Sequence, residues 1–160
     1  MTEFADAKEL VEILTEKKMT VTAAESCTGG LIAATIVDVP GASNVLRESY
    51  VTYAVSSKEK LLGVSPNTVA VHTVVSAEVA EEMAKGAAKS AGADLAISVT
   101  GYAGPDGGED GTPAGTVYIG VFLLGKVSSR RFLFEGDRRS VREQAVHAAI
   151  ALALEELKAL

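Results

Sequence analysis

Two glycine-rich turns carry the hydroxyl and amide groups best suited to binding an anion. The first, residues 26–30, reads Ser-Cys-Thr-Gly-Gly between a predicted strand and a predicted helix. Amide groups at a helix N-terminus attract anions, and glycine lets a ligand approach the backbone closely. We therefore expect Ser26, Thr28, Gly29 and Gly30 to contact a phosphate-bearing small molecule. A capped helix start with no ligand is the alternative, and the turn matches neither the Walker nor the GxGxxG pattern.

The second glycine-rich segment begins at Thr100 and runs to Gly108, directly after an apolar predicted strand. Ligands of open α/β sheets bind beyond the carboxyl ends of the strands, and successive backbone amides in such a loop form anion-binding concavities. We expect Thr100, Gly101 and Gly104 to contact the same ligand. A flexible surface loop is the alternative.

Two arginines stand at the start of the last predicted helix. Arg138 and Arg142 are four residues apart and share a helix face, so both could reach one phosphate. Cations in a first turn oppose the helix dipole at a cost of roughly 0.3–1 kcal/mol each, which a bound anion would offset. Ion pairs with Asp137, Glu143 or the acidic residues of the glycine-rich loop are the alternative.

A nucleophile is harder to identify from the residues alone. A serine needs a base to take its proton, and neither His72 nor His147 has a clear acidic partner in the sequence. A lysine can act as the base when burial or neighbouring cations lower its pKa. The single cysteine, Cys27, is interpreted as a small buried side chain, although a helix N-terminus lowers a thiol pKa.

Composition limits the class of protein. The 160 residues are 48% hydrophobic and 22% charged, which indicates one globular domain over residues 1–160. The net charge of -6 argues against nucleic acid as the main ligand, because nucleic-acid binding requires excess positive charge. We expect no membrane partner and a cytoplasmic location, since the sequence has no secretory signal and no apolar run of roughly 20 residues.

No metal and no cofactor are expected. Asp106, Glu109 and Asp110 lie close together in the sequence but have no histidine partners and no EF-hand spacing. The Val- and Ala-rich faces allow a homodimer without requiring one.

Hydrophobic periodicity predicts five helices and five strands. The helices are expected over 6–18, 31–37, 57–62, 77–91 and 137–157, and the strands over 20–24, 49–55, 94–100, 116–124 and 126–134. The last two strands flank Gly125 and are predicted to form an antiparallel hairpin. This order predicts a three-layer α/β/α fold with a mixed, mostly parallel sheet that includes one antiparallel strand.

Several short motifs resemble the CinA C-terminal domain family when taken together. In chain order they are AESCTGG at 24–30, VTY at 51–53 followed by Lys58, AGPDGG at 103–108, GTV at 115–117 and GDR at 136–138. The resemblance covers almost the whole chain and implies the stand-alone form of the domain. One departure is Tyr102, where many relatives have a small aliphatic residue, and this change would alter the shape of a pocket.

The resemblance implies hydrolysis of the carboxamide of nicotinamide mononucleotide to nicotinate mononucleotide and ammonia. It also implies a serine–lysine mechanism, with the nucleophile at Ser43, the base at Lys58 and a supporting role for Tyr53. Lys60 competes with Lys58 as the base, and Ser26 is the second candidate nucleophile. The alternative function is a non-catalytic nucleotide-binding module of the competence or damage-inducible type.

Overall fold

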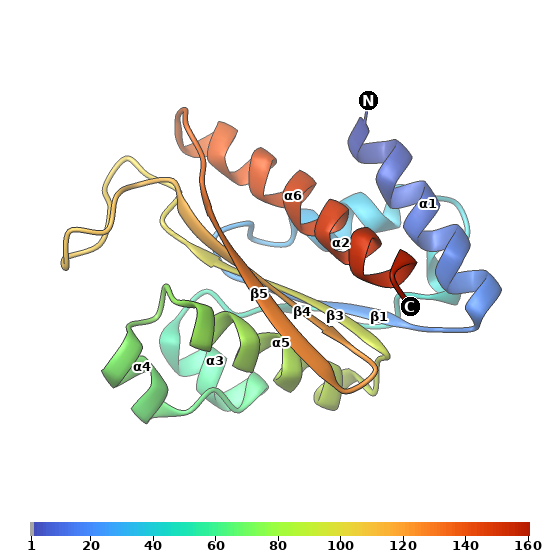
Figure 1. Cartoon of the computed structure of the whole chain (residues 1–160), viewed down its shortest axis with the longest axis horizontal. Helices are drawn as coiled ribbons and strands as arrows, with labels where there is room; N and C mark the ends of the chain where they lie inside the picture. Colours follow the sequence, from blue (N-terminus) through green and yellow to red (C-terminus); the bar gives the residue numbers. More distant parts are fainter. Residues whose placement is uncertain (1) are drawn as a thin grey trace.

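The computed structural model describes residues 2–160, with side chains described from residue 5 onward. Its centre is a five-stranded sheet in the order β2-β1-β3-β4-β5 (Figure 1). The strands are β1 (Val21–Glu25), β2 (Tyr50–Val51), β3 (Leu95–Gly101), β4 (Thr116–Leu123) and β5 (Lys126–Leu133).

The sheet is evenly mixed, so the expectation of a mostly parallel sheet was wrong. β1 pairs in parallel with β2 and β3, whereas β3–β4 and β4–β5 are antiparallel pairs. β5 returns directly from β4 through a tight turn, as the hairpin prediction required. Residues 102–115 between β3 and β4 form a loop without a helix, and the chain returns through it in the opposite direction.

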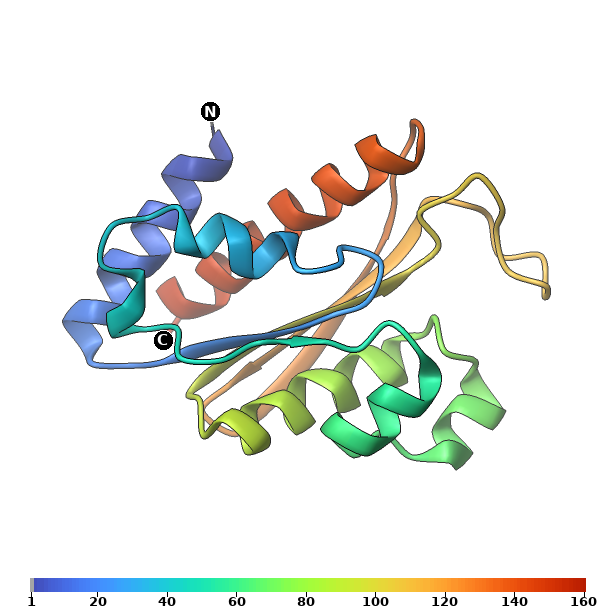
Figure 2. The same cartoon turned by 180° about the vertical axis from the view of Figure 1, so that it is seen from behind.

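Helices cover both faces of the sheet, as the three-layer prediction required. α1 (Thr2–Lys17), α2 (Leu31–Val37) and α6 (Arg138–Lys158) lie on one face, and α3 (Val55–Leu62), α4 (Pro66–His72) and α5 (Ala77–Ala91) lie on the other (Figures 1 and 2). A short 3-10 helix, η1 (Ala42–Asn44), precedes β2.

The sheet separates two apolar clusters because neighbouring strand residues point to opposite faces. Ala23 and Ile97 belong to the cluster under α1, α2 and α6, whereas Ala24 and Ala96 belong to the cluster under α5. Small residues let α5 pack closely: a Cβ added at Gly120 would lie 2.5 Å from the Ala80 carbonyl oxygen.

The expected elements agree with the structure to within a few residues, with two exceptions. α4 was not predicted, because its seven residues carry no helical apolar stripe and none of them is buried. β2 has only two residues instead of the seven expected, because the chain leaves the sheet after Val51 and begins α3 at Val55.

Candidate functional site

The site lies where three parallel strands end at the same edge of the sheet. Ser26 follows β1, Thr52 follows β2, and Thr100 and Gly101 close β3. This is the edge at which open α/β sheets bind ligands. A cavity of about 170 Å³ opens there, with walls from the 26–30 turn, Tyr53, α3, the 74–75 segment and the end of β3.

A buried lysine occupies the inner wall of this cavity. Lys58 is 1% exposed, and its Nζ lies 3.0 Å from Ser26 Oγ, 2.6 Å from the Thr52 carbonyl oxygen and 3.2 Å from the Tyr53 carbonyl oxygen. No carboxylate of the described residues lies within ion-pair distance of it. Burial therefore lowers the pKa of Lys58 to about 8, because the charged form loses hydration without gaining a counter-ion.

The three partners of Lys58 determine how it binds when it is neutral. A neutral amine has two N–H groups and one lone pair, and the carbonyl oxygens of Thr52 and Tyr53 can only accept hydrogen bonds. Ser26 is the one partner that can donate. The neutral lysine therefore gives its two hydrogens to the carbonyls and directs its lone pair at the Ser26 hydroxyl, which is the geometry of a base about to take a proton.

The structure does not bring Ser43 and Lys58 together. Ser43 lies exposed in η1, and the following Val45 carbonyl accepts a hydrogen bond from the amide of Val21 at the start of β1. Ser26 and Lys58 meet at the other end of that strand, roughly 16 Å away at about 3.3 Å per residue. Lys60 is exposed on α3, so Lys58 is the lysine of the cavity.

A second cavity lies beside η1 and offers no comparable chemistry. Its volume is about 570 Å³, and it lies between α1 and residues 39–44. Its charged lining residues, Lys8, Glu12 and Glu16, are all exposed to solvent. No buried lysine or histidine of the described chain lines it.

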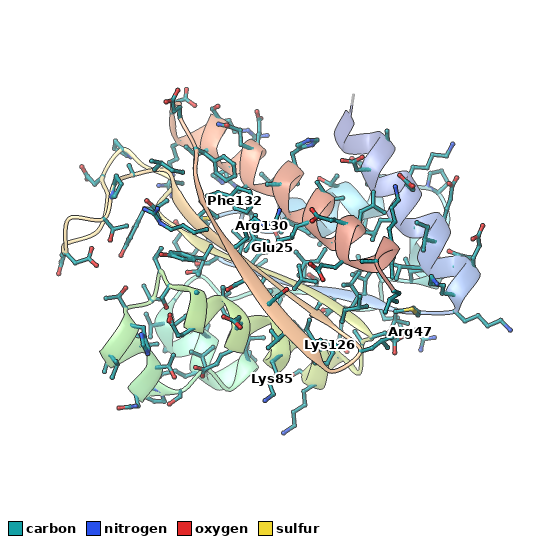
Figure 3. All side chains as sticks on the ribbon, viewed as in Figure 1. Glu25, Arg47, Lys85, Lys126, Arg130 and Phe132 are labelled. Atoms are coloured by element: carbon teal, nitrogen blue, oxygen red, sulfur yellow. The ribbon has the colours of Figure 1, made fainter. Side chains whose placement is uncertain are left out.

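Two amides at the start of α2, the helix end expected to attract a phosphate, are bound by a carboxylate of the chain itself. The carboxylate of Glu25 is fully buried and accepts hydrogen bonds from the amides of Ile32 (2.8 Å) and Ala33 (3.0 Å). Figure 3 shows Glu25 near the middle of the molecule rather than at its edge. Gly29 and Gly30 adopt positive φ angles of +59° and +102°, so these glycines are required by the turn itself.

The hydroxyl of Thr28 is buried and has no hydrogen-bond partner among the described residues. The backbone around it is firmly held, because Arg142 donates from Nε to the Cys27 carbonyl (2.9 Å) and from Nη2 to the Thr28 carbonyl (3.2 Å). Arg142 therefore joins α6 to the 26–30 turn.

Arg138 joins α6 to the other side of the cavity. It donates from Nη1 to the Gly104 carbonyl (2.6 Å) and from Nη2 to the Tyr53 hydroxyl (2.8 Å), and the side chain is exposed. Among the described residues neither Arg138 nor Arg142 forms the alternative ion pair with Asp137, Glu143 or the acidic residues of the loop. Asp137 caps α6 at the Ser140 amide, and Glu143 pairs with Arg139.

Thr100 lines the cavity, and the hydrogen of its hydroxyl is already donated within the protein. Its Oγ1 donates to the Val74 carbonyl (3.0 Å) and so fixes the segment between α4 and α5 that lines the cavity. Gly101 pairs with Val117 in the sheet, and a Cβ there would lie 2.7 Å from the Val117 side chain.

Cys27 and the two histidines contribute no nucleophile or base to the cavity. Burial raises the pKa of the Cys27 thiol to about 11, so the thiol is protonated at neutral pH. Neither His72 nor His147 lines the cavity; His72 lies 3.4 Å from Glu78. The part of the chain that the structure describes has no group of three or more His, Cys, Asp or Glu side chains placed to hold a metal ion.

Sequence reasoning missed the carbonyl of Thr52 and the wall residues Val74 and Val75. A backbone carbonyl carries no residue-type signal, because any residue could supply it. Ser26 and Thr52 could have been found from their positions directly after two neighbouring parallel strands. Recognising this requires the order of the strands in the sheet, which the sequence does not give.

None of the helices described is long and apolar enough to cross a membrane.

Comparisons with known proteins agree with the motifs. The model of the CinA C-terminal domain matches residues 4–157. A Caldicellulosiruptor saccharolyticus protein named "Putative competence-damage inducible protein" is 50% identical over 141 residues, which are 88% of this chain and 34% of the relative. A Clostridium acetobutylicum protein of the same name is 46% identical over 86% of this chain and 34% of its own length. The chain thus spans about a third of the length of these curated relatives.

Solved structures of similar chains have the same fold. A CinA superfamily protein from Klebsiella pneumoniae superposes with a TM-score of 0.96 at 38% identity and 99% coverage of both chains. A competence/damage-inducible protein from Agrobacterium tumefaciens superposes with a TM-score of 0.94 at 32% identity, covering 99% of this chain and 96% of its own. The chain belongs to the CinA C-terminal domain family.

Proposed function

We propose that this domain hydrolyses the carboxamide of nicotinamide mononucleotide, with Ser26 as the nucleophile and Lys58 as its base. One observation carries the proposal: a buried lysine without a counter-ion lies 3.0 Å from a serine hydroxyl in a cavity at the sheet edge. With a pKa of about 8, roughly a tenth of Lys58 is neutral at pH 7 and ready to accept a proton.

The reaction proceeds by acyl transfer. Neutral Lys58 takes the Ser26 proton, Ser26 Oγ attacks the amide carbon, and the tetrahedral oxyanion forms. The backbone amides of Cys27 and Thr28, which donate to no carbonyl among the described residues, are the donors that we assign to the oxyanion. Protonated Lys58 then gives its proton to the departing ammonia, and water hydrolyses the acyl-enzyme by the same route.

The dimensions of the site support a nucleotide amide. A cavity of about 170 Å³ is smaller than the roughly 300–1,000 Å³ of sites that enclose a drug-sized ligand, so it suits the carboxamide-bearing ring alone. The ribose and phosphate would then lie outside it, towards the exposed guanidinium of Arg138. Binding the remote phosphate would orient the amide for attack.

The test is ammonia release by purified protein, measured with chelator present on nicotinamide mononucleotide and on free nicotinamide. We expect release from the nucleotide, much weaker release from nicotinamide, and a loss of about 100- to 10,000-fold in Lys58→Met. Binding of the nucleotide without any ammonia release would reject the amidase and favour a nucleotide-binding module, the alternative that the names of the relatives leave open. Full activity in Lys58→Met would reject the proposed base.

A further inference from the structure

Tyr102 is the cavity residue that the proposed mechanism does not use. It follows directly after β3 and lines the cavity with Ser26 and Lys58. Of the described residues that line the cavity, Tyr102 alone comes from the loop between β3 and β4, which projects from the body of the molecule in both views (Figures 1 and 2).

The loop holds Tyr102 at both its backbone and its ring. The Tyr102 amide donates to the Thr116 carbonyl (3.0 Å), and the Tyr102 carbonyl accepts from the Gly115 amide (2.6 Å). A Cβ added at Gly108 would lie 2.8 Å from the Tyr102 hydroxyl oxygen and 2.9 Å from Cζ. The loop thus folds back onto the end of the ring at Gly108, and a side chain added there would require the ring to move.

The surroundings of Tyr102 are negative. The same Cβ added at Gly108 would lie 2.7 Å from Asp110 Oδ1, so this carboxylate is close to the Tyr102 hydroxyl. Burial, Asp110 and Glu109 all raise the pKa of Tyr102. Positive charge comes from Arg138 of α6, which contacts the Tyr53 hydroxyl and also the Gly104 carbonyl of the same loop.

This division of charge matches a zwitterion. Oxidised nicotinamide mononucleotide carries a positive charge on its pyridinium ring and negative charge on its phosphate. A cation is attracted to an aromatic ring and to nearby carboxylates, whereas a phosphate is attracted to arginine. Tyr102 with its neighbouring carboxylates suits the ring, and the guanidinium of Arg138 suits the phosphate.

We propose that Tyr102, held by Gly108 beside Asp110, is a specificity residue that recognises the positive charge of the pyridinium ring and selects oxidised over reduced nicotinamide nucleotides. The inference rests on the proposed function for the identity of the ligand. The reduced 1,4-dihydro nucleotide is the sharpest probe, because it keeps the carboxamide and the phosphate and loses the charge and the aromaticity of the ring.

The experiment measures equilibrium binding of both nucleotides to Ser26→Ala, so that turnover and the different reactivity of the two amides do not interfere. We expect the oxidised form to bind about tenfold more tightly. Adding Tyr102→Phe should keep this ratio, adding Tyr102→Leu should reduce it to about twofold, and adding Asp110→Asn should reduce it partly. Melting temperatures of the variants identify any that fail to fold.

The outcomes separate the two proposals. An unchanged ratio in folded Tyr102→Leu, or equal binding of the two nucleotides by Ser26→Ala itself, would overturn the role of Tyr102. Selective binding of the oxidised form by a wild-type protein that releases no ammonia would sustain that role and reject the amidase. Failure of both wild type and Ser26→Ala to bind either nucleotide, with no ammonia release from wild type, would overturn both.

Discussion

Lys58 is held by one serine hydroxyl and two carbonyl oxygens inside the protein. Three acceptors satisfy a protonated amine, and two carbonyls with one hydroxyl satisfy a neutral one. Both protonation states therefore have complete hydrogen bonding, and only the charge itself is disfavoured by burial. A group with these properties can gain and lose a proton without rearrangement of its surroundings, which is what a general base requires.

The first prediction concerns the pH dependence of catalysis. If neutral Lys58 is the base, kcat/KM for nicotinamide mononucleotide should rise with pH, about tenfold per unit well below pH 8, and level off above that value. Steady-state rates between pH 5.5 and 9.5 test this. A profile that is flat from pH 6 to pH 9 would contradict the assignment of Lys58.

The second prediction concerns stability. The folded pKa of Lys58 is about 8, below its ordinary value of 10.5, so between these pH values the unfolded chain binds more protons than the folded one. The free energy of unfolding should therefore rise with pH in this range, by at most about 3 kcal/mol. Below pH 8 both states are charged, and the full cost of burying the charge remains.

Urea denaturation at pH 7 and pH 10, compared with Lys58→Met, isolates this contribution from the other titrating groups. The difference in stability between wild type and Lys58→Met should move in favour of wild type at the higher pH. The same difference at both pH values would contradict a lowered pKa.

At the scale of elements, the junction of α4 and α5 is strained where it forms a wall of the cavity. Thr73 has φ of +69° and ψ of 164°, a region that is essentially restricted to glycine, and Val74 and Val75 next to it line the cavity. The Thr100 hydroxyl and the Ser76 hydroxyl bind carbonyls of this segment. Hydrogen bonds from the start of α5 and from β3 thus hold the strained backbone in this conformation.

The third prediction follows from this strain. Thr73→Gly should stabilise the fold by about 1 kcal/mol, because relief of the strained backbone outweighs the entropy that glycine loses on folding. Thr73→Ala removes the side chain and keeps the strain, and it is the matched control. A Thr73→Gly variant that unfolds at lower urea concentration than Thr73→Ala would contradict the interpretation.

Most elements of the fold were predictable, because their apolar periodicity is set by burial against the sheet. The three-layer arrangement and the β4–β5 hairpin followed from the order of elements. The balance of parallel and antiparallel strand pairs could not be predicted from that order, since it depends on the direction in which the 102–115 loop returns the chain. α4 carries no periodic apolar signal, and β2 is too short for one.

The site was predictable only in part. Ser26, Lys58, Tyr53 and Arg138 were all candidates, and the structure brings them around one cavity. The partner of Lys58 could not be chosen from the sequence, because only the fold puts Ser26 and Ser43 at opposite ends of β1. Glu25 was missed as the group that occupies the start of α2, since a buried carboxylate is not distinguishable from a surface one by type.

At the scale of the whole molecule, α6 ties the separate walls of the cavity together. Arg142 binds the turn after β1, and Arg138 binds Tyr53 and the loop after β3. Segments more than 80 residues apart in the chain are thereby fixed relative to one another. Their relative positions set the geometry of the cavity, so α6 contributes to the site without lining it.

The fourth prediction tests this role of α6. Arg142→Met should lower the free energy of unfolding by about 2 kcal/mol, because two carbonyls of the turn lose charged hydrogen-bond donors. Arg139→Met removes only an exposed pair with Glu143 and should change stability by less than about 0.5 kcal/mol. Equal effects of the two substitutions in urea denaturation would show that the turn does not depend on α6.

The most direct test of the account compares Ser26→Ala with Ser43→Ala in ammonia release from nicotinamide mononucleotide. Both substitutions remove one hydroxyl, but only Ser26 lies 3.0 Å from the buried lysine. We expect a loss of at least about 1,000-fold in Ser26→Ala and a rate within about twofold of wild type in Ser43→Ala. Retained activity in Ser26→Ala together with an inactive Ser43→Ala would contradict this expectation.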